Sequence, residues 1–153
     1  MSDPLRQIYL VDDDPAILKA LSRLLRSAGY ETVAFASAKS FMESYSADAP
    51  GCLVLDVAMP EITGLELQSW LVQSNSPLPV IFLTGRADIP DSVKAMKAGA
   101  IDFLTKPVNK IELLCRIRSL LRVRHLENQL ERTLAYLAEF ETASRASAST
   151  GAP

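Results

Sequence analysis

The chain has 153 residues, of which 48% are hydrophobic and 22% are charged, and its net charge is −2. This composition supports one domain with a buried core, excludes wholesale disorder and gives no general attraction to nucleic acid or anionic membranes. The two cysteines, Cys52 and Cys115, form no CxxC motif, so neither a disulfide framework nor a zinc site is expected. Because no signal peptide or membrane-spanning run is present, we expect a cytoplasmic protein.

Strand and helix patterns alternate along the chain. Apolar runs predict strands at 8–11, 32–35, 52–55, 80–83 and 101–104. The first, third and fourth runs are apolar at every position, which is typical of strands covered on both faces in a parallel sheet. Helical spacing fills the gaps, with starts at Asp14, Ser37 and Pro90, a third helix around 67–71, and a fifth from Asn109. Five such units predict a doubly wound α/β domain, because a βα solenoid would need a repeat period that is absent.

The fifth helix has no stop near residue 122. Apolar residues continue at heptad spacing at Val123, Leu126, Leu130, Leu137 and Phe140, with Thr133 at one polar position. Two interpretations are open: an extension packed on its own domain, or a dimerising or signal-carrying helix. The second is favoured, because an isolated amphipathic stripe must be buried against something. Residues 143–153 are small and polar, which predicts a disordered tail.

Polar side chains stand where the predicted strands end. Asp12 and Asp13 follow the first strand, Asp56 and Thr84 end the third and fourth, and Lys106 follows the fifth. Because the carboxyl ends of parallel strands meet at one edge of the sheet, these side chains are expected to converge. Three close carboxylates repel one another, and oxygen ligands alone favour a hard cation such as Mg²⁺. A carboxylate beside Mg²⁺ and a lysine can attack phosphorus and form an aspartyl phosphate.

Several stretches resemble the receiver domain of two-component response regulators, most closely the FixJ-like branch. They are IYLVDDDP (8–15), FASAKSF (35–41), GCLVLDVAMPEITGLEL (51–67) and PVIFLTGRADIPDSVKAMKAGAIDFLTKP (79–107). The resemblance covers about residues 5–122 and implies a flavodoxin-like fold, a five-stranded parallel sheet of order 2-1-3-4-5 with an extended C-terminal helix. The expected organisation is a receiver domain at 1–122, a helical extension capable of a short coiled coil at 123–142, and a tail at 143–153.

The resemblance also implies a role for each residue at the strand ends. Asp56 would accept the phosphoryl group, and Lys106 would pair with it. Asp12, Asp13 and Asp56 would hold Mg²⁺ together with the backbone carbonyl of Ala58. The family pattern departs at Ala58, which offers no side chain to position an attacking water, so slow autodephosphorylation is expected.

The same resemblance implies a conformational switch. Thr84 would move towards the phosphoryl group, and Phe103 occupies the position of the rotating aromatic residue. The Lys106–Pro107 bond would be cis. Phe103 has no hydroxyl group, so a switch that depends on a tyrosine hydrogen bond is excluded. Ala58 and Arg86 occupy the two positions that tune dephosphorylation in this family.

The implied partners are proteins of the same signalling system. The phosphodonor would be a sensor histidine kinase or a phosphotransfer protein. A homodimer would form through the face of the fourth helix, fifth strand and fifth helix, together with the long C-terminal helix. FixJ-like regulators carry a DNA-binding output domain that this sequence lacks, which leaves open a free-standing receiver or a missing domain. The basic residues of the long helix alternate with glutamates, so direct DNA binding is not expected.

Three functions are weighed. The first is a phosphorylation-controlled switch, which is not an enzyme acting on external substrates. The second is a Mg²⁺-dependent phosphatase of the haloacid dehalogenase type, which needs a general acid two residues after its nucleophile, where this chain has Ala58. The third is a phosphorylation-independent scaffold on a receiver fold, against which the intact set of polar residues argues.

Overall fold

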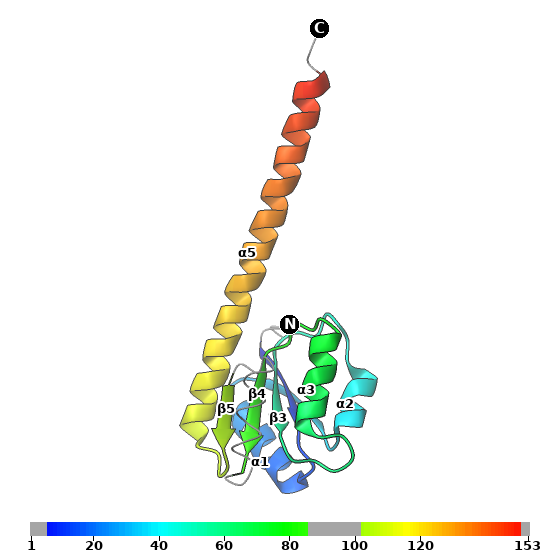
Figure 1. The fold of residues 1–153 in the computed structure, drawn as a ribbon. Coiled ribbons are helices and arrows are strands. Elements are labelled where there is room, and N and C mark those ends of the chain that lie inside the picture. The colour runs from blue at the N-terminus through cyan, green and yellow to red at the C-terminus, as the bar shows by residue number, and fades with distance from the viewer. Residues whose placement is uncertain (1–5, 86–101, 151–153) are drawn as a thin grey trace. The chain divides into compact units, whose positions relative to one another are not determined.

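A computed structural model of the chain describes residues 6–85 and 102–150. Five parallel strands form one sheet in the order β2-β1-β3-β4-β5, so β2 and β5 are the outer strands. The strands are β1 (Gln7–Val11), β2 (Glu31–Phe35), β3 (Cys52–Asp56), β4 (Val80–Thr84) and β5 (Asp102–Thr105). The doubly wound sheet predicted from the sequence is therefore confirmed, including its strand order (Figure 1).

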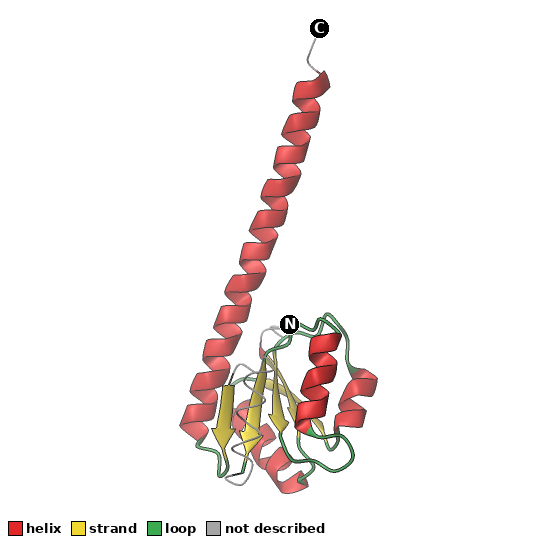
Figure 2. Cartoon of the chain, in the orientation of Figure 1, coloured by secondary structure: helices red, strands yellow, loops and turns green. Residues whose placement is uncertain are grey.

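Four helices are described, and Figure 2 distinguishes them from the strands and loops. They are α1 (Pro15–Ser27), α2 (Ala38–Ser44), α3 (Gly64–Gln73) and α5 (Lys110–Thr150). Asp14 and Ser37 cap α1 and α2 as predicted, because their side-chain oxygens accept the backbone N–H groups of Ala16 and Ser40. The helix predicted from Pro90 lies outside the described residues.

The sheet is covered on both faces, which explains why its central strands are apolar at every position. In β3, Cys52 and Val54 face one core, and Leu53 and Leu55 face the other. The first core contains buried apolar residues of α1 and of the first part of α5: Leu21, Leu25, Leu113, Ile117, Leu120 and Leu121. The second core contains buried apolar residues of α2 and α3: Ala38, Phe41, Leu67 and Leu71.

The chain divides into two compact units, Met1–Leu121 and Arg122–Pro153. Helix α5 continues through Thr150, whereas the sequence predicts a disordered tail from residue 143. The alanines in this stretch explain the difference, because alanine has the highest intrinsic helix propensity. In the described part of the chain, no helix is both long and apolar enough to cross a membrane.

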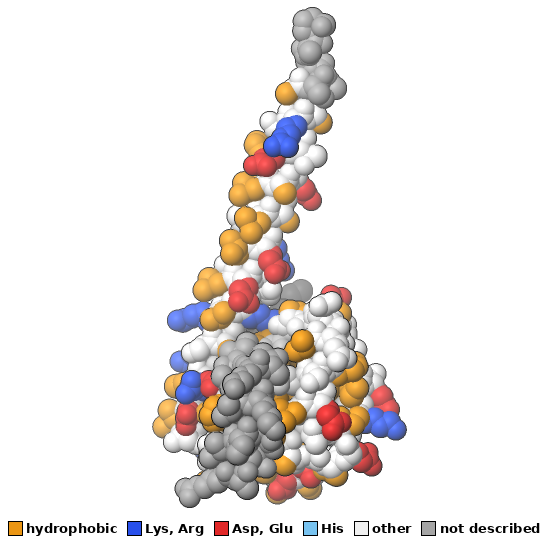
Figure 3. All heavy atoms as spheres, in the orientation of Figure 1, with side chains coloured by type: hydrophobic (Ala, Val, Ile, Leu, Met, Phe, Trp, Pro, Cys, Tyr) orange, Lys and Arg blue, Asp and Glu red, His pale blue; other side chains and the backbone are white. Residues whose placement is uncertain are grey.

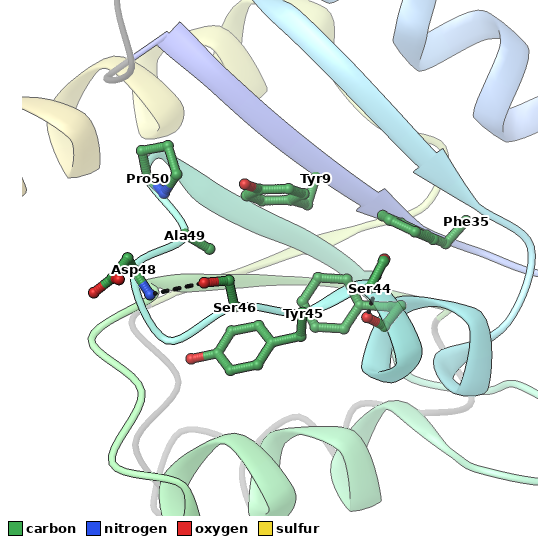
Figure 4. Close-up of a pocket in the computed structure, with 9 residues that line it drawn as sticks. Tyr9, Phe35, Ser44, Tyr45, Ser46, Asp48, Ala49 and Pro50 are labelled. Carbon is green, nitrogen blue, oxygen red and sulfur yellow. Dashed lines mark hydrogen bonds between the residues drawn. The ribbon is translucent and has the colours of Figure 1, made fainter.

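Phe41 is the centre of an aromatic cluster in the second core. Its ring lies 6.0 Å from that of Tyr9, 5.4 Å from Phe35 and 5.8 Å from Tyr45, measured between centroids. The same four rings line a pocket of about 200 Å³, and Figure 4 labels Tyr9, Phe35 and Tyr45 among the residues around it. Phe41 is 1% exposed, so its truncation would enlarge an existing cavity.

We expect Phe41→Ala to lower the free energy of unfolding by about 3 to 5 kcal/mol, the range for truncating a buried phenylalanine. Urea unfolding followed by circular dichroism measures this change. Val72→Ala on α3 is the control, because Val72 is 54% exposed and its truncation should cost little. A loss at Phe41 no larger than at Val72 would contradict the packing described for this core.

Candidate functional site

The strand register brings the predicted site residues together at one edge of the sheet. Val11 of β1 pairs with Leu55 of β3, so Asp12 and Asp56, the next residues in each strand direction, lie side by side. In the same way, Thr84 at the end of β4 pairs with Thr105, directly before Lys106. Residues separated by 94 positions in the sequence thus meet at the carboxyl ends of four strands.

Three carboxylates form the centre of this edge. Asp12, Asp13 and Asp56 each offer an oxygen, and these three oxygens lie within 4.8 Å of one another. Asp12 and Asp56 are 2% and 5% exposed, whereas Asp13 is open to solvent. The backbone N–H of Asp14 donates to Oδ1 of Asp12 at 2.9 Å, which fixes the orientation of that carboxylate.

Lys106 places its ammonium group between the two buried carboxylates. Its Nζ lies 3.3 Å from Oδ2 of Asp12 and 3.3 Å from Oδ1 of Asp56. The backbone N–H of Lys106 donates to the carbonyl oxygen of Thr84 at 2.7 Å, which ties the start of this loop to β4. The Lys106–Pro107 bond is cis, as the resemblance implies.

The electrostatics of the cluster are those of an incompletely neutralised acidic site. The pKa of Asp56 is raised from 3.8 to about 6, mainly by burial and then by the charge of Asp12, while the charge of Lys106 acts in the opposite direction. Burial by itself would lower the pKa of Lys106, but the charges of Asp56 and Asp12 outweigh burial and raise it. One lysine therefore does not offset the repulsion of this carboxylate group.

The donor set fits a hard divalent cation. Carboxylate oxygens from three positions converge, and no histidine or cysteine takes part in the group. A cation among these oxygens would relieve both the desolvation cost and the repulsion that raise the pKa of Asp56. The cluster can therefore hold a metal ion of the Mg²⁺ type.

Thr84 ends β4, and Phe103 lies on the adjacent outer strand β5. The Thr84 side chain is buried, and its Oγ1 donates to the carbonyl oxygen of Gly85 at 3.0 Å. Phe103 is half-buried on β5 beside Phe82 of β4 and packs against the second core. Arg86, which the sequence places next to Gly85, lies outside the described residues.

Gly64 supports the site, and its role was not predicted from the sequence. It is the first residue of α3, and an added Cβ at this position would collide with the backbone carbonyl oxygen of Asp56. Its N–H donates to the carbonyl oxygen of Val57 at 3.0 Å, which holds the start of α3 against the loop after β3. One feature of the sequence could have indicated this role. Gly64 directly follows the capping residue Thr63, where the helix itself does not require glycine, so a close approach of another segment is the remaining reason for it.

Comparison with known proteins decides the family. The sequence profile of the response regulator receiver domain matches residues 8–118. The chain belongs to this family. Response regulators are signalling proteins of two-component systems, so the interpretation of the sequence as a receiver domain is confirmed.

Relatives of this receiver domain include longer response regulators. It is 49% identical to the response regulator protein TodT of Pseudomonas putida over 123 residues, which cover 80% of this chain and 54% of TodT. It is 44% identical to TmoT of Ectopseudomonas mendocina over 146 residues, which cover 95% of this chain and 66% of TmoT. The chain thus spans between half and two thirds of the length of these relatives.

Solved structures agree with the fold of the receiver domain. The response regulator StyR superposes with a TM-score of 0.81 at 40% identity, over 89% of this chain and 69% of StyR. The structure described as FixJ-N superposes with a TM-score of 0.73 at 33% identity, over 80% of this chain and 96% of FixJ-N.

In the metal-free protein, Asp56→Asn is expected to raise the free energy of unfolding at pH 7.5 by about 3 kcal/mol. Aspartate ionises near pH 3.8 in the unfolded chain and near pH 6 at position 56 in the folded one, so ionisation destabilises the folded state increasingly as the pH rises through this window. Asparagine has no charge to develop and avoids this cost.

Urea unfolding in the presence of EDTA at pH 7.5 and pH 4.5 measures the effect. The advantage of Asp56→Asn should shrink at the lower pH, and Asp48→Asn, an exposed carboxylate in the loop before β3, should change little at either pH. An advantage of Asp56→Asn that is the same at both values would show that the Asp56 charge is not its cause.

Proposed function

We propose that this receiver domain is a phosphorylation-controlled switch with Asp56 as the phosphoryl acceptor. The observation that carries the proposal is the position of Asp56, which ends β3 and shares the ammonium group of Lys106 with a second buried carboxylate, Asp12. Asp56 is 5% exposed and ends its strand at the carboxyl edge of the sheet, so its carboxylate is largely desolvated. Desolvation strengthens a carboxylate as a nucleophile.

In the proposed transfer, an Asp56 carboxylate oxygen attacks the phosphorus of a phosphohistidine on a sensor histidine kinase or phosphotransfer protein. The new bond is O–P, the bond that breaks is N–P, and the histidine nitrogen leaves with the bonding electron pair. Lys106, 3.3 Å from Asp56, compensates negative charge on the phosphoryl oxygens. Mg²⁺, held by Asp12, Asp13, Asp56 and the Ala58 carbonyl, would neutralise further charge on the same oxygens.

The proposed output is a change in the surface that includes β5 and α5. Thr84 would exchange its present bond to the Gly85 carbonyl for one to the phosphoryl group, and Phe103 would follow into the space beside β4. On this surface Arg116 of α5 pairs with Asp102 of β5 at 2.7 Å, an ion pair that such a movement would disturb. We propose that this face, with the fourth helix and the long α5, forms a homodimer in the cytoplasm.

Two other functions have less support. A phosphatase acting on external substrates needs a general acid two residues after the nucleophile, and Ala58 has no ionisable group there. A scaffold that never carries phosphate would not need two buried carboxylates and a lysine kept together at a cost in stability.

The proposal is tested by incubating the protein with Mg²⁺ and acetyl phosphate and measuring the intact mass. We expect a single phosphoryl adduct in the wild type and none in Asp56→Asn, because asparagine cannot form the acyl phosphate. Asp48→Asn is the matched control and should be modified like the wild type. An adduct that persists in Asp56→Asn, or no adduct in any variant, would overturn the assignment.

We further expect phosphorylated Asp56 to hydrolyse slowly, with a half-life of minutes or longer, because Ala58 cannot orient a water molecule for attack on the phosphoryl group. Ala58→Asn supplies an amide at this position and should raise the rate of dephosphorylation about tenfold. The decay of the phosphoryl adduct, followed by mass after removal of acetyl phosphate, gives both rates. A wild-type half-life of seconds, or no effect of the substitution, would contradict this role of Ala58.

A further inference from the structure

In the second unit, Arg122–Pro153, the described residues 122–150 are helical and carry an apolar stripe. The stripe comprises Val123 (51% exposed), Leu126 (57%), Leu130 (58%), Leu137 (48%) and Phe140 (64%). Figure 3 shows apolar side chains repeated along this part of the helix. Exposure of five large apolar side chains to water is unfavourable, so a partner that covers them would gain a substantial hydrophobic free energy.

The spacing of the stripe is that of a coiled coil. Its members follow one another at intervals of three, four, seven and three residues, and Thr133 divides the interval of seven into three and four. This gives Val123, Leu130 and Leu137 at the a positions and Leu126, Thr133 and Phe140 at the d positions. Thr133 Oγ1 donates to the carbonyl oxygen of Gln129 at 2.9 Å, so its hydroxyl group is satisfied within its own helix and can enter an apolar layer.

The charges on this segment argue for another copy of the chain as the partner. From residue 122 to residue 150 there are four arginines and four glutamates, so the segment has no net formal charge. A polyanion such as nucleic acid, or an anionic lipid surface, would select an excess of basic residues that the segment does not have. A heptad helix without net charge can instead bind a second copy of itself, because its surface is self-complementary.

The same charges select the orientation. Arg122 occupies a g position and Glu127 the following e position, and in a parallel coiled coil these two positions of opposite chains lie next to each other. The pair then occurs twice in the dimer, once on each side of the apolar seam. In the antiparallel arrangement that aligns the same apolar layers, Arg122 lies beside Ala143 and Glu127 beside Leu134, so neither charge finds a partner.

We propose that the stripe from Val123 to Phe140 forms a parallel, in-register, two-stranded coiled coil with a second copy of the chain, and that Arg122 and Glu127 fix its direction. The inference rests on the homodimer of the proposed function and specifies its helical part. Because the stripe is only about two and a half heptads long, the dimer dissociates on dilution.

The first test introduces a charge into the stripe of the full chain. Leu130→Asp should abolish the dimer in size-exclusion light scattering, whereas Ala135→Asp, the same charge at an outward f position, should leave it intact. Thr133→Leu replaces the polar layer and should tighten the dimer at least tenfold. A monomeric wild type at high micromolar concentration, or equal behaviour of Leu130→Asp and Ala135→Asp, would overturn the proposal.

The second test determines the direction by oxidative cross-linking in a Cys115→Ser background, which removes the exposed native thiol. Leu126→Cys faces its own copy in the parallel dimer and should form a disulfide-linked dimer. Asn128→Cys, at an outward f position, should not. Cross-linking only between chains carrying Leu126→Cys and chains carrying Leu137→Cys would establish the antiparallel arrangement and overturn the proposal.

Charge reversal gives an independent check of the direction. Arg122→Glu and Glu127→Arg should each weaken the dimer, and the double variant should restore it, since each pair then has opposite charges again. An absence of rescue would contradict the assigned pairing. The phosphoryl adduct on Asp56 is measured separately in the same variants, so failure of the coiled coil and failure of the phosphorylation site give different results.

Discussion

The repulsion between buried carboxylates at the carboxyl edge of the sheet is the constraint on which the rest of the site depends. The register of β1 against β3 forces Asp12 and Asp56 to be neighbours, and neither can withdraw without breaking strand pairs. Lys106, which the β4–β5 pairing brings to the same edge, compensates only part of this charge. The fold therefore holds an excess of negative charge at this edge, which a divalent cation would stabilise.

Much of this arrangement could be predicted because it follows from local patterns. The central strands are apolar at every position, which only a sheet covered on both faces explains, and this fixes the class of fold. The polar residues Asp12, Asp56 and Thr84 stand at strand ends, so the topology alone brings them together. Asp14 and Ser37 predict the starts of α1 and α2, because helix capping depends on a single side chain and its nearest backbone groups.

Other features depend on contacts between segments that are far apart in the sequence, so no local pattern predicts them. The contact of Lys106 with both Asp12 and Asp56 joins residues at the ends of three strands, so it depends on how the whole sheet is assembled. The need for glycine at position 64 arises from the Asp56 carbonyl oxygen above it, a contact between two different elements. The continuation of α5 through Thr150 was missed because small polar residues are compatible with both disorder and helix, and the alanines among them decide for helix.

The outer strands of the sheet have a consequence for how the protein associates. β2 has five residues and β5 has four, and each begins with a carboxylate, Glu31 or Asp102. Short outer strands with a charged first residue are poor templates for an added strand, because a further strand would gain few backbone hydrogen bonds and would have to approach a charge. These two outer strands are thereby protected against edge-to-edge aggregation.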